Sequence, residues 1–255
     1  MGKLNPWNHK EDVTHVPVTK LTSLVNDTSA LKPIPDKKFY LAMDFNKVDD
    51  FHYHDNKYYP LSAINDTLRL FVPQINHVSL ILPPSPPLTQ LADLDKNLFC
   101  NYETVDDRNC TENYCECVYR LHVDLNDVVE LVILDEGQTY NANHPMHLHG
   151  HKFNVIGMEK LGDTLTLDKV KQLDAEGKLH RNFVDPVFKD TVTIPDGGYT
   201  IIRFHANNPG FWFFHCHIEF HVDIGMGLII HTGNETDLPQ VPKNFPRCGN
   251  WKYTG

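Results

Sequence analysis

Residues 211–226 read FWFFHCHIEFHVDIGM, and this stretch decides both the fold and the chemistry that we expect of the chain. Its apolar run ending in HCH predicts a buried β-strand. Neighbouring side chains on a strand point to opposite faces, so Cys216 should face one way while His215 and His217 face the other. One strand end could therefore serve two metal sites, joined through the backbone of Cys216.

The ligand types on the Cys216 side are those of a blue-copper electron-transfer centre, which uses one thiolate, two imidazoles and a weak thioether. Cys216, His221 and Met226 supply three of these four at spacings that a single loop can bring together. A buried cysteine could instead be a disulfide partner or a packed thiol, and Met226 could be a core residue of the GMGLII strand. The second histidine has to come from elsewhere in the chain.

Further histidines are clustered in the segment HPMHLHGH at residues 144–151. His147 and His149 share a face at period two, while His144 stands apart behind Pro145. A lone HxH pair would mean little, but two clusters with correct internal spacing favour a metal site. We therefore predict that this segment and residues 211–226 meet in the fold.

Together the two segments resemble the C-terminal copper motifs of multicopper oxidases, the group of laccases, ascorbate oxidases and ferroxidases. The flanking sequence looks most like the insect laccase-type branch, in particular at NPGFWFFHCH, at VDPVF (184–188) and at PKNFPRCGNW near the end. The resemblance runs from about Lys38 onward. It implies that His144, Cys216 and His221 bind the type 1 (blue) copper with Met226 axial, that His147 binds the type 2 copper, and that His149, His215 and His217 bind the type 3 pair. His151 matches no ligand position and is expected on a strand.

The resemblance also implies a reaction. A reducing substrate (a diphenol, ascorbate or ferrous iron) would give single electrons at the exposed edge of His221. They would cross Cys216 to His215 and His217, and four electrons would reduce O2 to water. Glu219 and Asp223 could place acid near that edge, although surface solvation is the simpler reading.

The number of histidines limits this reading. In the family the trinuclear cluster uses eight histidines, of which this chain has four, and the N-terminal cupredoxin domains of the full-length protein supply the others. We expect an oxidase that is incomplete without those domains. The alternatives are a free-standing cupredoxin that binds copper or transfers electrons without oxidase activity, and a chain that assembles with copies of itself.

Length and charge narrow the remaining classes of function. The 255 residues allow one large domain or two small ones. A formal net charge of −10 argues against nucleic acid or an anionic membrane as a partner. There is no run of about 18 apolar residues that would predict a transmembrane segment.

Cysteines and glycosylation sequons point to the secretory pathway and to a disulfide-bonded glycoprotein. The sequons begin at Asn26, Asn65, Asn109 and Asn234. Besides Cys216 there are five cysteines, namely Cys100, Cys110, Cys115, Cys117 and Cys248. Those from Cys100 to Cys117 could form two local bridges, which leaves Cys248 over; in the family a cysteine near the C-terminus often bridges back to the first domain. Since MGKLNPWNHK lacks the apolar stretch of a signal peptide, we expect a C-terminal piece of a longer secreted protein.

We predict an all-β, Greek-key cupredoxin sandwich or barrel with one short surface helix. Residues 1–37 read as a linker or the tail of a preceding domain, and residues 38–255 as the third cupredoxin domain of a multicopper oxidase. Strands are expected at 38–45, 77–82, 152–158 and, as a pair, within 120–134. DTVTIP (190–195) and the following YTIIRFHA should form a hairpin around DGG.

Two further segments carry smaller predictions. Leu167, Val170 and Leu173 recur at helical spacing, which predicts the surface helix, with Gly177 near its end. His52 and His54 form another HxH pair, but it lacks the following glycine and the apolar flanks of a copper motif. We do not expect this pair to bind metal.

Overall fold

The computed structural model describes residues 16–25, 27–46, 72–110, 113–137 and 142–248. The His52–His54 pair and the sequon residues Asn26 and Asn65 lie outside these ranges. The strands are β1 (Lys37–Asn46), β2 (Val72–Ile75), β3 (Val78–Leu80), β4 (Phe99–Asn101), β5 (Cys115–Val123), β6 (Val128–Asp135), β7 (His144–Leu148), β8 (Phe153–Lys160), β9 (Phe188–Lys189), β10 (Thr191–Ile194), β11 (Gly198–His205), β12 (Gly210–Cys216) and β13 (Gly227–Thr232). The α-helices are α1 (Pro87–Gln90), α2 (Leu167–Ala175) and α3 (Glu219–Asp223).

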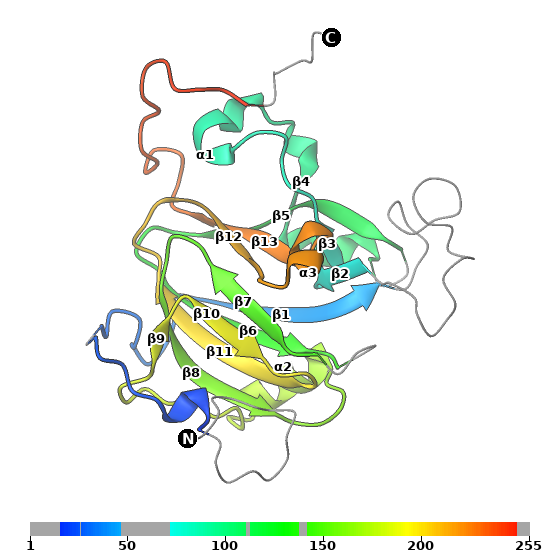
Figure 1. The fold of residues 1–255 in the computed structure, drawn as a ribbon, viewed down its shortest axis with the longest axis vertical. Coiled ribbons are helices and arrows are strands. Elements are labelled where there is room, and N and C mark those ends of the chain that lie inside the picture. The colour runs from blue at the N-terminus through cyan, green and yellow to red at the C-terminus, as the bar shows by residue number, and fades with distance from the viewer. Residues whose placement is uncertain (1–15, 26, 47–71, 111–112, 138–141, 249–255) are drawn as a thin grey trace.

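Among the described residues the strands form one continuous sheet that folds over on itself (Figure 1). Its order is β10-β7-β12-β13-β5-β3-β2-β1-β6-β11-β8-β9, and β4 pairs with β5. Strand β5 joins the halves, because it pairs in parallel with β13 on one side and with β3 on the other. The predicted all-β class is therefore confirmed.

The core fills the space between the two halves of the sheet. Leu41 and Leu131 come from the β1–β6 half, Leu121 and Phe214 from the β5–β12 half, and all four are fully buried. Burying each such side chain contributes about 1.5–3 kcal/mol. Cys216 belongs to the same cluster, so its thiol is held by the core packing itself.

Helix α2 covers the outer face of β6 and β11, as the sequence pattern predicts. The Thr166 hydroxyl accepts the backbone N–H of Lys169 and so caps the first turn. Val170 is fully buried against Val132 and Ile201. With the core on one face and α2 on the other, every residue of β6 is buried.

The predicted hairpin at DGG is wrong. Strand β10 pairs with β7, whereas β11 pairs with β6 and β8, so the chain changes from one half of the sheet to the other at this turn. Pro195 has no N–H to continue a ladder. At Gly198 a Cβ atom would lie 2.4 Å from a carbonyl oxygen of β8, so the turn presses against that strand. One side-chain bond, from the Thr200 hydroxyl to the Thr193 carbonyl (2.9 Å), still links the two segments.

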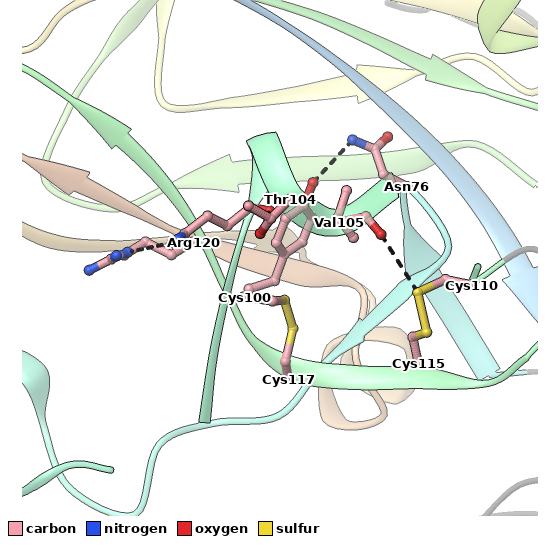
Figure 2. The surroundings of a disulfide bond; sticks show 10 residues. Asn76, Cys100, Thr104, Val105, Cys110, Cys115, Cys117 and Arg120 are labelled. Carbon is pink, nitrogen blue, oxygen red and sulfur yellow. Dashed lines mark hydrogen bonds between the residues drawn. A yellow bond between two sulfur atoms is a disulfide. The ribbon is translucent and has the colours of Figure 1, made fainter. Parts of the chain in front are cut away.

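Two local disulfides staple the segment before and within β5, as the cysteine spacing suggested. Cys100 bonds to Cys117 and Cys110 to Cys115. Figure 2 shows both bridges beside β5, with Arg120 extending away from them. The remaining cysteine outside the core, Cys248, is an exposed free thiol.

Residues 16–25 and 27–36 lie against the sandwich near β8 and β9 (Figure 1). Val18 and Ala30 are buried, and the Arg203 side chain donates to the carbonyl oxygens of Lys32 and Pro33. In the part of the chain that is described, no helix has the length and apolar character that crossing a membrane requires.

Candidate copper centre

Three potential metal ligands meet where β12 ends. Strands β12 and β7 are antiparallel neighbours, with Cys216 opposite Met146, and this register brings Cys216 close to His144 at the start of β7. The short helix α3 follows β12 and turns His221 back toward the thiol. The Cys216 sulfur lies 3.7 Å from Nδ1 of His144 and 3.7 Å from Nδ1 of His221, and the two nitrogens are 3.2 Å apart.

These separations fit one small metal ion. With metal–nitrogen bonds of about 2.0 Å and a metal–sulfur bond of about 2.3 Å, ligands in a trigonal arrangement lie about 3.5–3.7 Å from one another. Two imidazoles and a thiolate in this geometry are the ligand set of a blue-copper site. Among the described residues, His144, Cys216 and His221 are the one group of three such side chains that could share an ion.

Burial sets the protonation states of this group. Desolvation lowers the pKa of His144 to about 3 and also lowers that of His221, so both imidazoles are neutral at pH 7 and can offer a lone pair. Desolvation raises the pKa of the Cys216 thiol to about 12. The thiol therefore keeps its proton until a metal takes the proton's place.

An acidic residue and an aromatic ring complete the surroundings, and the sequence did not point to either. Asp135, at the end of β6, places a carboxylate oxygen 3.3 Å from Nε2 of His144, which leaves Nδ1 of that ring facing the thiol. This is a close contact without hydrogen-bond geometry. The Phe45 ring lies 5.7 Å from the His144 ring and 5.3 Å from the His221 ring.

Met226 is fully buried next to the three ligands. Its N–H donates to the His221 carbonyl (2.8 Å), and its carbonyl accepts the N–H of Cys216 (3.0 Å). These bonds fix the loop between β12 and β13 around the site. Coordination by the Met226 thioether stays a prediction.

A second cluster lies on the opposite face of the same strand end. It consists of His147, His149, His215 and His217, whose neighbouring ring centroids are 4.9–5.9 Å apart. Nε2 of His149 is 3.1 Å from Nε2 of His215. Nδ1 of His147 contacts the Asp190 carbonyl and the Thr191 hydroxyl, both at 2.9 Å, which leaves its Nε2 available.

Cys216 connects the two clusters. Nδ1 of His215 donates to the Cys216 carbonyl at 2.9 Å, so a hydrogen bond supplements the peptide bond between these residues. The Phe213 ring stacks on His215 at 4.2 Å and holds its plane. Burial, together with the neighbouring imidazoles, lowers the pKa of both His149 and His215, which keeps them neutral.

Three other residues considered from the sequence take no part in either cluster. His151 precedes β8 instead of lying on a strand, and it is buried against Phe204 and Trp212. Glu219 and Asp223 are exposed on α3.

Comparison with known proteins places this chain in a family. The multicopper oxidase family model matches residues 82–235. Laccase-7 of Oryza sativa subsp. japonica is 40% identical over 127 residues, which cover 48% of this chain and 21% of that protein. Laccase-4 of Arabidopsis thaliana is 34% identical over 194 residues, covering 69% of this chain and 32% of that protein. These relatives are plant laccases, so they give no support to a place in the insect laccase-type branch.

A solved structure shares the fold. Fet3p, described as a multicopper oxidase that functions in iron import, superposes with a TM-score of 0.54 at 23% identity, over 84% of this chain and 35% of that one. This likeness bears on the fold alone and agrees with a cupredoxin-like sandwich. The chain thus spans about a fifth to a third of the lengths of these relatives. It belongs to the multicopper oxidases, a family of copper-binding oxidoreductases.

Proposed function

We propose that this chain is the C-terminal cupredoxin domain of an oxidase that passes electrons from a reducing substrate to O2. The observation that carries the proposal is the meeting of His144, Cys216 and His221 on one face of a strand end whose other face bears four clustered histidines. Burying imidazoles costs desolvation energy, and a site that binds a ligand gives a reason for that cost.

The residues divide into two metal sites. His144, Cys216 and His221 would hold the type 1 copper, with Met226 axial. His147 would hold the type 2 copper, and His149, His215 and His217 the type 3 pair. When bound, copper supplies the one-electron chemistry that links a reductant to O2.

The chain itself provides the route between the sites. His221 is half-buried and follows exposed Phe220, so its edge is the point nearest to solvent where a reductant could deliver electrons. The Cys216 backbone and the hydrogen bond from His215 to the Cys216 carbonyl join that point to the second cluster. Asp135 lies beside Nε2 of the His144 ring, whose Nδ1 faces the Cys216 thiol.

The reductant and the partner domains belong to the proposal as well. A diphenol, ascorbate or ferrous iron are the candidate substrates, and a steady-state comparison on the longer protein would distinguish them. The preceding cupredoxin domains would supply the histidines that complete the second cluster. A free-standing cupredoxin is the competing function, because the first site needs no residue from outside this chain.

We propose that the protein is secreted and glycosylated. The two local disulfides support an oxidising compartment. Among the sequon residues, Asn109 and Asn234 are exposed, as glycan attachment requires. Glycosidase treatment of the protein from its native source tests this: an unchanged mass would contradict it.

A pair of cysteine variants tests the copper assignment. Cys216→Ser should abolish the blue absorption of the copper-loaded chain, because a hydroxyl cannot replace the thiolate. Cys248→Ser is the matched control, since Cys248 is exposed and lies outside both clusters. Persistence of the colour in the Cys216 variant would overturn the assignment.

A further inference from the structure

A third histidine contact lies on β5 and β13, away from both copper clusters. His122 and His231 are directly opposite each other in the parallel pairing of these strands. Their Nδ1 atoms are 3.4 Å apart, and their ring centroids 5.0 Å apart. The separation is close to the 3.2 Å between the Nδ1 atoms of His144 and His221, a distance suited to two ligands of one ion.

The two rings face outward from the core. Leu121 and Val123, which alternate with His122 on β5, are fully buried in the core, so His122 lies on the other face of the sheet. His231 is opposite Phe211 on β12, and the period of two puts Phe211 on the same face as His215. The pair thus shares its sheet face with the four-histidine cluster, one strand length away from it.

A carboxylate orients the exposed member of the pair. Oδ1 of Asp124 lies 3.5 Å from Nε2 of His122, a close contact whose negative charge favours the tautomer of a neutral ring with its proton on Nε2, and Nδ1 of that ring faces His231. Asp135 stands in the same relation to His144 at the first copper site. In both places an acidic side chain lies beside one ring nitrogen, and the other nitrogen faces a neighbouring potential ligand.

The other member is buried with one of its two ring nitrogens unpaired. His231 is 6% exposed, and its Nε2 has no hydrogen-bond partner among the described residues. Its ring plane is fixed by stacking on Phe211 at 4.1 Å and 8°. Burial, with His122 and Arg120 nearby, lowers the pKa of His231 to about 4, so the ring is neutral at pH 7. Buried polar groups are normally hydrogen-bonded, so the unpaired nitrogen of this buried ring and its fixed orientation toward a second imidazole need an explanation.

We propose that His122 and His231 form an additional metal site on this sheet face, for an imidazole-preferring ion of the Cu²⁺ or Zn²⁺ class. The two Nδ1 atoms are the protein ligands, and Asp124 is a positioning residue. Water completes the coordination, since His122 is 37% exposed in its side chain and gives an ion access from solvent. The Arg120 guanidinium opposes a cation here, but it is turned toward Asn101 (3.1 Å) and the Phe99 ring (5.5 Å).

Equilibrium dialysis against Zn²⁺ tests the site in the full chain, after its blue centre has been filled with copper. His122→Ala should bind one Zn²⁺ fewer than the wild type, or bind it at least about tenfold more weakly. Asp124→Asn should weaken the same site by about tenfold, in the lower part of the range for residues that orient metal ligands. His180→Ala, which removes an exposed histidine from a different part of the surface, should change nothing.

Two readouts locate the effect. Anomalous diffraction at the zinc edge should show the ion between the two Nδ1 atoms. The blue absorption should stay unchanged in all three variants, because none of them touches the Cys216 site. Equal Zn²⁺ stoichiometry and affinity in wild type and His122→Ala, no anomalous peak between the rings, or loss of the blue colour in His122→Ala would each overturn the proposal. The outcome is independent of the proposed oxidase function, which depends on other histidines.

Discussion

At the scale of single residues, Met226 offers the most direct test of the blue-copper assignment. Met226→Leu removes a weak axial donor at nearly constant volume, so packing should change by less than about 1.5 kcal/mol. Losing that donor destabilises oxidised copper more than reduced copper, so the reduction potential should rise. A redox titration measures it. Met158→Leu, at another buried methionine, is the control, and equal potentials in wild type and Met226→Leu would make Met226 a core residue only.

The assignment of the two faces of β12 is tested by two histidines of the same segment. His215→Ala should leave the blue absorption of the copper-loaded chain intact, because the His215 ring lies with His149 across the strand from the Cys216 thiol. His221→Ala should remove that absorption, since its Nδ1 is 3.7 Å from the sulfur. Bleaching in the His215 variant would contradict the division of faces.

The sequence could predict the potential metal ligands better than the residues that surround them. Cys216 and His221 lie five positions apart, so the local chain alone brings them together, and strand alternation separates Cys216 from His215. Asp135 and Phe45 could not be found in this way. They reach His144 because β1 and β6, which pair with each other, pack against the opposite half of the sheet, and no local pattern encodes that packing.

At the scale of elements, the same reasoning explains which predictions succeeded. Helix α2 is specified locally, by the Thr166 cap and by Val170 on the apolar side, and it forms where the pattern predicts. The predicted β10–β11 hairpin is wrong although the chain does turn at DGG, because the two strands on either side of the turn do not pair with each other. Pairing is decided by the partners β7, β6 and β8, which lie far away in sequence.

A buried ion network joins β6, β11 and α2 and makes stability depend on pH. Glu130 of β6 is fully buried and accepts hydrogen bonds from Arg203 (2.7 Å) and Arg181 (2.8 Å), and Arg181 also pairs with Asp174 of α2. Burial alone would raise the Glu130 pKa, but these arginines outweigh it and hold the pKa below its usual range. The folded state thus favours the charged carboxylate.

Glu130→Gln should lower the free energy of unfolding at pH 7 by about 3–5 kcal/mol, because it leaves a buried guanidinium without its counter-charge. A group with a depressed pKa stabilises the fold above its unfolded pKa of about 4.3 and loses that effect as pH falls through the folded pKa. The difference between variant and wild type should therefore shrink below about pH 4. Urea unfolding at pH 7 and pH 3 measures both values. Glu235→Gln, at an exposed site, is the control; a difference that does not depend on pH would contradict the assignment.

At the scale of the whole molecule, the two clusters differ in completeness. The first has its thiolate and both imidazoles within this chain, enclosed by core packing. The second presents imidazoles toward a surface, and its partly exposed rings, His147 and His217 among them, have no protein enclosing them on the outer side among the described residues. An O2-reducing centre excludes bulk water, so under the proposed function this face would be covered by a partner.

The last prediction follows from that asymmetry. The chain alone, loaded with copper, should develop one blue centre per molecule and take up no O2 in the presence of a reductant. A longer protein that includes the preceding cupredoxin domains should take up O2, and His215→Ala in that protein should abolish the uptake while the blue colour persists. An oxygen electrode and the blue absorption, recorded on the same samples, measure both properties.

Rapid O2 uptake by the chain alone would contradict the need for partner domains. If the longer protein stays blue but takes up no O2 with diphenol, ascorbate or ferrous iron, the free-standing cupredoxin is favoured. In that case the site at Cys216 would transfer electrons, but no oxygen-reducing cluster would receive them.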